Sequence, residues 1–317
     1  MRSFFDFEKP AAELQAKIDE MLGLVAKGES AALSEEITRL EDRFAATLAT
    51  IYANLTPWQK TQVARHDQRP HFVHYVRDLI TDFTPLAGDR KFAEDEAIIG
   101  GFGRFQGAAV CVLGHEKGAD IDTRLKHNFG MARPEGYRKA VRLMELADRF
   151  GLPVISLIDS AGAFPGIDAE ERGQAEAIAR STDASLALGV PNVAVIVGEG
   201  GSGGAIAIAS CNRVLMLEHA IYTVASPEAA ASILWKKSEN AADAANNMKI
   251  TAQDLKALGV IDAIVPEPVG GAHRDRDATI KSVGDAIAKV LAEFSDVSPE
   301  AVRTARADKF LAIGRGL

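Results

Sequence analysis

The residues best suited to chemistry are glycines in a segment that follows an apolar run. Val193–Val197 has the composition of a buried strand, and Gly198–Gly204 comes directly after it with five glycines, a glutamate and a serine. Glycine lets the backbone approach a ligand closely, and the free N–H groups at the start of a following helix carry partial positive charge. The segment therefore predicts a site for an oxygen atom that carries or develops negative charge.

Three kinds of site fit this glycine-rich segment, and the first is a dinucleotide site. Gly198, Gly200 and Gly203 match the G-x-G-x-x-G fingerprint after a strand, and Glu218 lies at the end of a later strand, where the fingerprint expects an acidic residue. The stretch between the two strands has room for only about two helical turns, which is short for such a crossover. The short crossover therefore argues against a dinucleotide site.

The second kind of site is the nucleophile of a serine hydrolase. Ser202 stands in a G-x-S-x-G pattern, and Asp262 and His273 follow in the chain order of that class. A five-residue match is common by chance in glycine-rich sequence. The third kind is an oxyanion hole in which the amides of Gly203 and Gly204 bind the oxygen and no side chain acts as a nucleophile.

A second turn of small residues favours the oxyanion hole. Val154–Asp159 is another buried apolar run, and Ser160–Gly166 turns out of it. Two such turns on successive strand–helix units can place two sets of N–H groups around one cavity. This arrangement suits enolate chemistry on a thioester. Neither a dinucleotide site nor a hydrolase requires the second turn in this form.

Two patterns along the chain position these turns. From Ile98 onward, short apolar runs alternate with helical patterns, which predicts an α/β layered fold with parallel strands covered on both faces. Before that, apolar residues recur at helical spacing through Pro10–Gly28 and Ser30–Leu55, which indicates an antiparallel helical hairpin. We therefore expect a helical extension for partner contact over residues 1–85 and an α/β unit over residues 86–317.

Composition narrows the class of protein further. The sequence has 317 residues, of which 47% are apolar and 25% charged, and a net charge of −8. This is the profile of a soluble globular protein, and its acidity argues against nucleic acid or an anionic membrane as main partner. Cys111 and Cys211 suggest neither a disulfide framework nor a metal site. Without a signal peptide or membrane span in the sequence, we expect a cytoplasmic protein.

Ten segments spread over nearly the whole chain occur in an order typical of one family: Phe5–Pro10, Ala64–Pro70, Leu86–Arg90, Gly114–Gly118, Asn128–Met131, Pro134–Ala140, Ala169–Ala179, Gly198–Ala205, Ser232–Lys236 and Pro266–Arg274. Through them the chain resembles the α-subunits of bacterial acetyl-CoA carboxylase carboxyltransferase. Two segments depart from the usual family pattern: Ser160-Ala161 and Phe164 replace Thr-Pro and Tyr in the first turn, and Ala229 replaces glycine after Glu228. Both departures keep small residues where the family has them, apart from the aromatic exchange.

The resemblance implies a crotonase-like fold and an active site shared with a homologous β-subunit, in an assembly of two α and two β subunits. It implies transfer of the carboxyl group from carboxybiotin, on the biotin carboxyl carrier protein, to acetyl-CoA, which gives malonyl-CoA for fatty-acid synthesis. In such complexes another component, biotin carboxylase, is implied to carboxylate biotin at the expense of ATP. The chain itself is expected to bind no cofactor covalently and no metal.

The resemblance also implies roles for particular residues. The amides of Gly203 and Gly204 are expected to serve the biotin oxygen, with help from Gly162 and Ala163 on the facing turn. Which amide pair serves biotin and which the thioester stays open. The residues expected to contact substrate are Gly200, Gly201, Ser202, Phe164, Pro165, Lys117 and Arg133, the last two in a basic stretch that could meet CoA phosphates. The remaining alternatives are a serine hydrolase and a non-catalytic scaffold.

Overall fold

A single eight-stranded sheet forms the centre of the molecule. The computed structural model describes residues 3–25 and 32–315. The strand order is β1-β2-β3-β4-β5-β6-β8, and β7 pairs with β5 beyond the end of its contact with β6. The pairs β1–β2 and β2–β3 are antiparallel, and all later pairs are parallel. The strands are β1 (Ile80–Pro85), β2 (Ile98–Phe105), β3 (Ala108–His115), β4 (Val154–Ser160), β5 (Asn192–Gly201), β6 (Arg213–Leu217), β7 (Ile221–Thr223) and β8 (Ala263–Val265).

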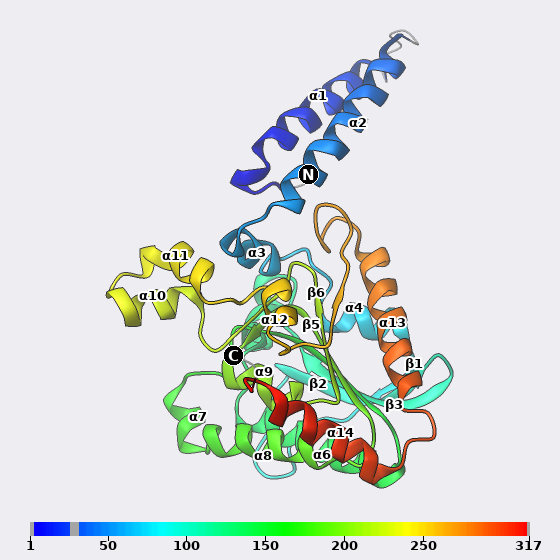
Figure 1. Ribbon diagram of the computed structural model, residues 1–317, viewed down its shortest axis with the longest axis vertical. Coiled ribbons are helices and arrows are strands. Elements are labelled where there is room, and N and C mark those ends of the chain that lie inside the picture. The colour runs from blue at the N-terminus through cyan, green and yellow to red at the C-terminus, as the bar shows by residue number, and fades with distance from the viewer. Residues whose placement is uncertain (1–2, 26–31, 316–317) are drawn as a thin grey trace.

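Helices cover both faces of this sheet. In Figure 1, α6 and α8 lie below the sheet and α4 and α13 beside its opposite face. Every residue of β4 and β5 is buried, as expected for parallel strands between two helical layers. The predicted α/β fold is confirmed. The helices are α1 (Lys9–Val25), α2 (Ala32–Ala53), α3 (Pro57–Ala64), α4 (Phe72–Leu79), α5 (Ile121–Lys126), α6 (Pro134–Phe150), α7 (Ile167–Glu171), α8 (Gln174–Ala187), α9 (Ser202–Ala209), α10 (Pro227–Trp235), α11 (Ala241–Asn247), α12 (Ala252–Ala257), α13 (Arg276–Glu293) and α14 (Pro299–Ala312).

The predicted helical hairpin is α1 and α2, which project together from the rest of the molecule (Figure 1). Ile18 on α1 packs with Ile37 and Leu40 on α2, so the apolar stripe of each helix meets the other. Residues 26–31, which join the two helices and include Gly28, lie outside the described residues.

One buried carboxylate fixes the base of the hairpin to the body. Glu8 is fully buried and accepts hydrogen bonds from the Tyr52 hydroxyl at 3.0 Å and from Arg274 Nη2 at 2.8 Å. Burial of a charge is costly unless it is paired, and both partners here come from distant parts of the chain. Glu8 thus joins the start of α1, the end of α2 and the loop before α13.

The boundary expected after residue 85 stays a prediction. The strand just before it, β1, pairs with β2 in the main sheet, and α4 packs on the sheet beside α13. Across residues 3–25 and 32–315, no helix combines the length and the apolar character needed to cross a membrane.

Candidate functional site

The two predicted turns leave the same edge of the sheet. Strands β4 and β5 are parallel neighbours, and Ser160 at the end of β4 lies opposite Gly200 near the end of β5. The first turn follows Ser160, and α9 begins at Ser202 directly after β5. Adjacent parallel strands therefore deliver both turns to one place, as the sequence predicted.

The backbones of the two turns are in direct contact. A Cβ atom on Gly201 would lie 2.1 Å from the carbonyl oxygen of Ala161, and one on Gly204 would lie 2.8 Å from the amide nitrogen of Ala163. Real Cβ atoms essentially never approach other atoms so closely. A Cβ on Gly203 would instead meet only the Ile178 side chain, at 3.3 Å. Gly201 and Gly204 are therefore needed for packing the two turns together, whereas Gly203 has space beside it.

The start of α9 offers free N–H groups. Gly203 and Gly204 are the second and third residues of the helix, where N–H groups have no acceptor within the helix. No atom of the described residues accepts a hydrogen bond from either amide. Gly203 is half-buried, so a ligand at the surface can reach the site. The helix dipole adds partial positive charge at this point.

The first turn holds its own shape through Ser160. The amide of Gly162 donates to Ser160 Oγ at 3.2 Å, and this hydroxyl donates in turn to the Gly162 carbonyl oxygen at 2.7 Å. The amide of Ala163, the next residue, has no acceptor among the described residues. The structure thus brings together three unpaired amides, those of Gly203, Gly204 and Ala163, whereas the Gly162 amide is engaged within its turn.

Hydrogen bonds hold the far side of the first turn to the segment before α6 and to the start of α8. The Phe164 amide donates to the Ala132 carbonyl at 3.0 Å, and the Gln174 side chain donates to the carbonyl oxygens of both residues, at 3.0 and 2.8 Å. The Arg133 guanidinium lies 4.3 Å from the centre of the Phe164 ring. Pro165 is exposed. Arg133, Phe164 and Pro165 therefore share one surface, and the sequence reasoning missed Gln174, which carries no motif.

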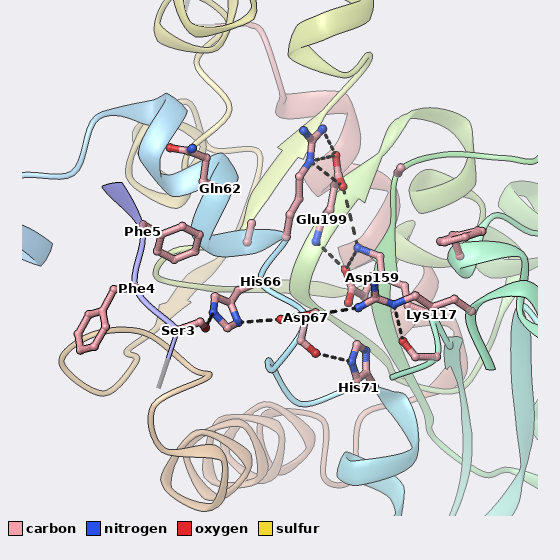
Figure 2. Close-up of a pocket in the computed structure, with 16 residues that line it drawn as sticks. Ser3, Phe4, Phe5, Gln62, His66, Asp67, His71, Lys117, Asp159 and Glu199 are labelled. Carbon is pink, nitrogen blue, oxygen red and sulfur yellow. Dashed lines mark hydrogen bonds and ion pairs between the residues drawn. The ribbon is translucent and has the colours of Figure 1, made fainter. Parts of the chain in front are cut away.

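Lys117 lies in the segment after β3 and faces acidic groups. Its ammonium is 2.6 Å from Asp159 Oδ1 and 3.9 Å from Glu199 Oε2, and its side chain is mostly buried. Figure 2 shows these three residues together in the wall of a cavity of about 580 Å³. The cavity reaches the turn at Ala161, and Gly203 and Gly204 are not in its lining.

The serine-hydrolase alternative finds no support in this geometry. Ser202 has a φ of 51°, a strained conformation also found at nucleophile elbows, but no histidine or carboxylate of the described residues contacts its hydroxyl. Asp262 instead binds Lys309 and the Val214 amide. His273 stacks on the ring of His66 at 3.9 Å. The predicted partners of Ser202 are thus committed elsewhere.

The dinucleotide alternative fails for steric reasons. A Cβ on Gly198 would lie 2.4 Å from the Asp159 carboxylate, and one on Gly200 would lie 2.9 Å from the Tyr222 ring. The space beside these glycines is filled by protein atoms, so a pyrophosphate cannot occupy it. Glu218 accepts a hydrogen bond from the Glu267 amide.

Comparisons with known proteins agree with the predicted resemblance. Residues 4–314 match the family described as "Acetyl co-enzyme A carboxylase carboxyltransferase-like". Proteins of Xanthobacter autotrophicus and Beijerinckia indica, each named acetyl-coenzyme A carboxylase carboxyl transferase subunit alpha, are 68% identical over 317 residues, which is 100% of this chain and of each relative.

Solved structures show the fold. A transcarboxylase 12S structure superimposes with a TM-score of 0.59 and 16% identity over 74% of this chain and 44% of that chain. A Pseudomonas malonate decarboxylase hetero-dimer gives 0.54 and 17% over 68% of this chain and 89% of that chain. The predicted crotonase-like fold is confirmed, since the neighbours are carboxyltransferases and related enzymes of that fold.

Proposed function

The chain belongs to the acetyl-CoA carboxylase carboxyltransferase-like family, and we propose that it acts as the α-subunit of such an enzyme. In this role it transfers, together with a β-subunit, a carboxyl group from carboxybiotin to acetyl-CoA and so makes malonyl-CoA. The observation that carries the proposal is the pair of unpaired amides at Gly203 and Gly204, on a chain that matches the family over its length.

The amides supply what this reaction needs most. Carboxybiotin supplies CO2, and its ureido nitrogen takes the proton that leaves the methyl carbon of acetyl-CoA, which then bonds to CO2. Negative charge develops on the ureido oxygen of biotin and on the thioester oxygen of acetyl-CoA. The Gly203 and Gly204 N–H groups, fixed by α9, bind the ureido oxygen, and each such donor is worth about 3 kcal/mol in the transition state. The Ala163 N–H, on the contacting turn, adds a third donor.

The surroundings of the amides support a site without a protein base. His115 is fully buried, and burial lowers its pKa to about 4, so its ring is a weak base that substrate cannot reach from the surface. Among the described residues, Ser202 has no basic partner. A reaction in which the cosubstrate accepts the proton fits such a site.

The site's exposure supports an active site shared with a second subunit. Ala161 and Pro165 are exposed, and Ala163 and Gly203 are half-buried beside the buried Gly204, so the site opens at the surface of this chain. Electrostatic stabilisation is strongest where water is excluded, and a covering surface supplies that exclusion. We place the β-subunit over this surface, in an α2β2 assembly that receives biotin from the carrier protein after biotin carboxylase has carboxylated it.

Activity of the reconstituted subunits tests the proposal. The chain is produced with and without the β-subunit of the same organism, and malonyl-CoA decarboxylation is followed with biocytin as acceptor. Activity only in the mixture is the expected result. Activity of this chain alone would contradict the division of the site between subunits. A mixture that shows no activity and no association of the two chains would contradict the proposed function.

A further inference from the structure

Two buried carboxylates lie at the ends of the strands that lead into the two turns. Asp159 is the penultimate residue of β4, and Glu199 is the third residue from the end of β5; their exposed fractions are 4% and 3%. Asp159 Oδ1 accepts a hydrogen bond from the Glu199 amide at 2.9 Å. The two strand ends are therefore linked directly before Ser160 on β4 and within the glycine-rich segment on β5.

Two cations from other parts of the chain complete this cluster. Lys117, from the segment after β3, holds Asp159 as described above. Arg65, at the end of α3, reaches Glu199 through Nη2 at 2.7 Å and through Nε at 3.1 Å to both carboxylate oxygens. Arg65 Nη1 also lies 2.6 Å from Glu228 on α10. We call Arg65, Lys117, Asp159 and Glu199 the charge cluster; Figure 2 shows its members Lys117, Asp159 and Glu199 side by side.

The charge cluster also explains one glycine of the fingerprint. The Asp159 carboxylate lies on the Cα of Gly198, where a Cβ would come within 2.4 Å of Oδ1. The Asp159 carboxylate is thus packed against Gly198 of β5, and it accepts a hydrogen bond from the amide of the next residue, Glu199. A shift of β4 against β5 would break both contacts.

The cost of such a cluster argues for a role beyond stability. Taking charges out of water is expensive, and well-packed apolar residues in place of a buried ion pair are often equally or more stabilising. Burial raises the pKa of Asp159, yet the Lys117 ammonium and the Glu199 amide outweigh it and hold that pKa below its usual value. Asp159 is therefore charged at physiological pH, and its geometry is specified by its partners.

We propose that the charge cluster positions the two turns for catalysis: it fixes the end of β4 against the end of β5, and thereby aims the amides of Ala163, Gly203 and Gly204 at one oxygen. The proposal rests on the function proposed above. Preorganised donors must keep their place within about 0.5 Å, and a misplacement of about 1 Å costs about 100-fold in rate. Arg65 brings the N-terminal helical region, which we expected only to make contacts, into the support of the site.

The test compares neutral variants of nearly the same shape. Asp159→Asn and Glu199→Gln keep the size of each side chain and remove its charge. We expect kcat of the reconstituted enzyme to fall about 10- to 100-fold, with KM for malonyl-CoA unchanged. The unfolding midpoint should also fall, because each variant removes the charge that pairs with a mostly buried cation. Arg65→Gln is expected to act in the same direction.

A matched control comes from an ion pair of the same kind at another edge of the sheet. Lys309 on α14 pairs with Asp262, and both side chains are mostly buried. Lys309→Gln should alter the unfolding midpoint as much as the cluster variants do while leaving kcat unchanged. Should a single variant fail to fold, the double variant Lys117→Met/Asp159→Asn, which leaves no unpaired charge, takes its place.

Hydrogen exchange separates this proposal from the proposed function. Amide exchange in the peptide 198–206 should be faster in the cluster variants than in wild type and unchanged in Lys309→Gln, whether or not the enzyme turns over acetyl-CoA. An inactive wild-type mixture would contradict the proposed function, while the exchange data would still test the positioning role. Unchanged kcat and unchanged exchange in both Asp159→Asn and Glu199→Gln would overturn the positioning role, and so would a rise in KM at constant kcat.

Discussion

The carbonyl oxygen of Ala161 occupies the place where a side chain on Gly201 would begin, 2.1 Å from the ideal Cβ position. The two turns are therefore one packed unit and not two loops that happen to be close. A single added methyl group at Gly201 is therefore expected to disturb both turns.

Gly201→Ala should separate the two turns. The obstructing atoms are backbone, which cannot rotate away as a side chain can, so we expect a loss of about 1–3 kcal/mol in the free energy of unfolding. Activity in the subunit mixture should fall at least about 100-fold. Urea unfolding and malonyl-CoA decarboxylation measure the two effects. Wild-type values for both would show that the turns are not in contact.

Gly203→Val should separate chemistry from folding. A Cβ at Gly203 meets only the Ile178 side chain at 3.3 Å, so the helix can keep its place while the added methyl groups block close approach to the amides. We expect activity to fall about 10²- to 10³-fold, the loss typical of an oxyanion-hole donor, at a nearly unchanged unfolding midpoint. Ile206→Val, at an exposed position of the same helix, is the control and should be fully active.

Ser202→Ala should retain activity within a few fold. Because no base of the described residues contacts the Ser202 hydroxyl, the oxygen contributes no nucleophile. A fluorophosphonate probe should leave Ser202 unmodified in the wild-type chain, which mass spectrometry of the tryptic peptides detects. Labelling of Ser202, lost in Ser202→Ala together with activity, would favour a hydrolase.

Stability should decrease in mild acid because of His273. Burial, with the nearby His66 and Arg274, lowers the pKa of His273 from 6.5 to about 3. Between these two values the unfolded chain binds a proton that the folded chain does not, so stability falls as pH falls from about 6.5 towards 3. The slope per group approaches 1.4 kcal/mol per pH unit.

His273→Phe isolates this contribution. Neither ring nitrogen of His273 has a hydrogen-bond partner within the described residues, and a phenyl ring can keep the stack on His66. Urea unfolding at pH 7.5, 6.0 and 5.0 should show a shallower loss of stability in the variant, by about 1 kcal/mol for each pH unit. Parallel pH profiles for the two proteins would contradict the assignment to His273.

The elements that the sequence predicted are those with a strong local pattern. The buried runs Val154–Asp159 and Val193–Val197 became β4 and β5, because a continuous apolar run between turn residues has few other solutions in an α/β protein. The stripe of α1 and α2 was equally clear. The short strand β7 was not predicted, since three residues carry too little pattern and pair with β5 only after the fold is complete.

The support of the site could not be predicted, because it depends on contacts between distant residues. Nothing local to Arg65 indicates Glu199 as its partner. Lys117 was expected to contact substrate, and no pattern around it predicts its ion pair with Asp159. Likewise, the glycine turn predicted free amides, but only the structure shows that Ser160 occupies the amide of Gly162 while that of Ala163 stays unpaired.

The neighbours of the glycines also limit how this segment can change over evolutionary time. Gly198 faces the Asp159 side chain and Gly200 faces the Tyr222 ring, so a larger residue at either position can be accommodated if its neighbour becomes smaller. Gly201 and Gly204 face main-chain atoms of the first turn, which no substitution can shorten. Gly198 and Gly200 can therefore each change together with the side chain that it faces, whereas the backbone contacts of Gly201 and Gly204 among the described residues leave no side chain whose change would make room.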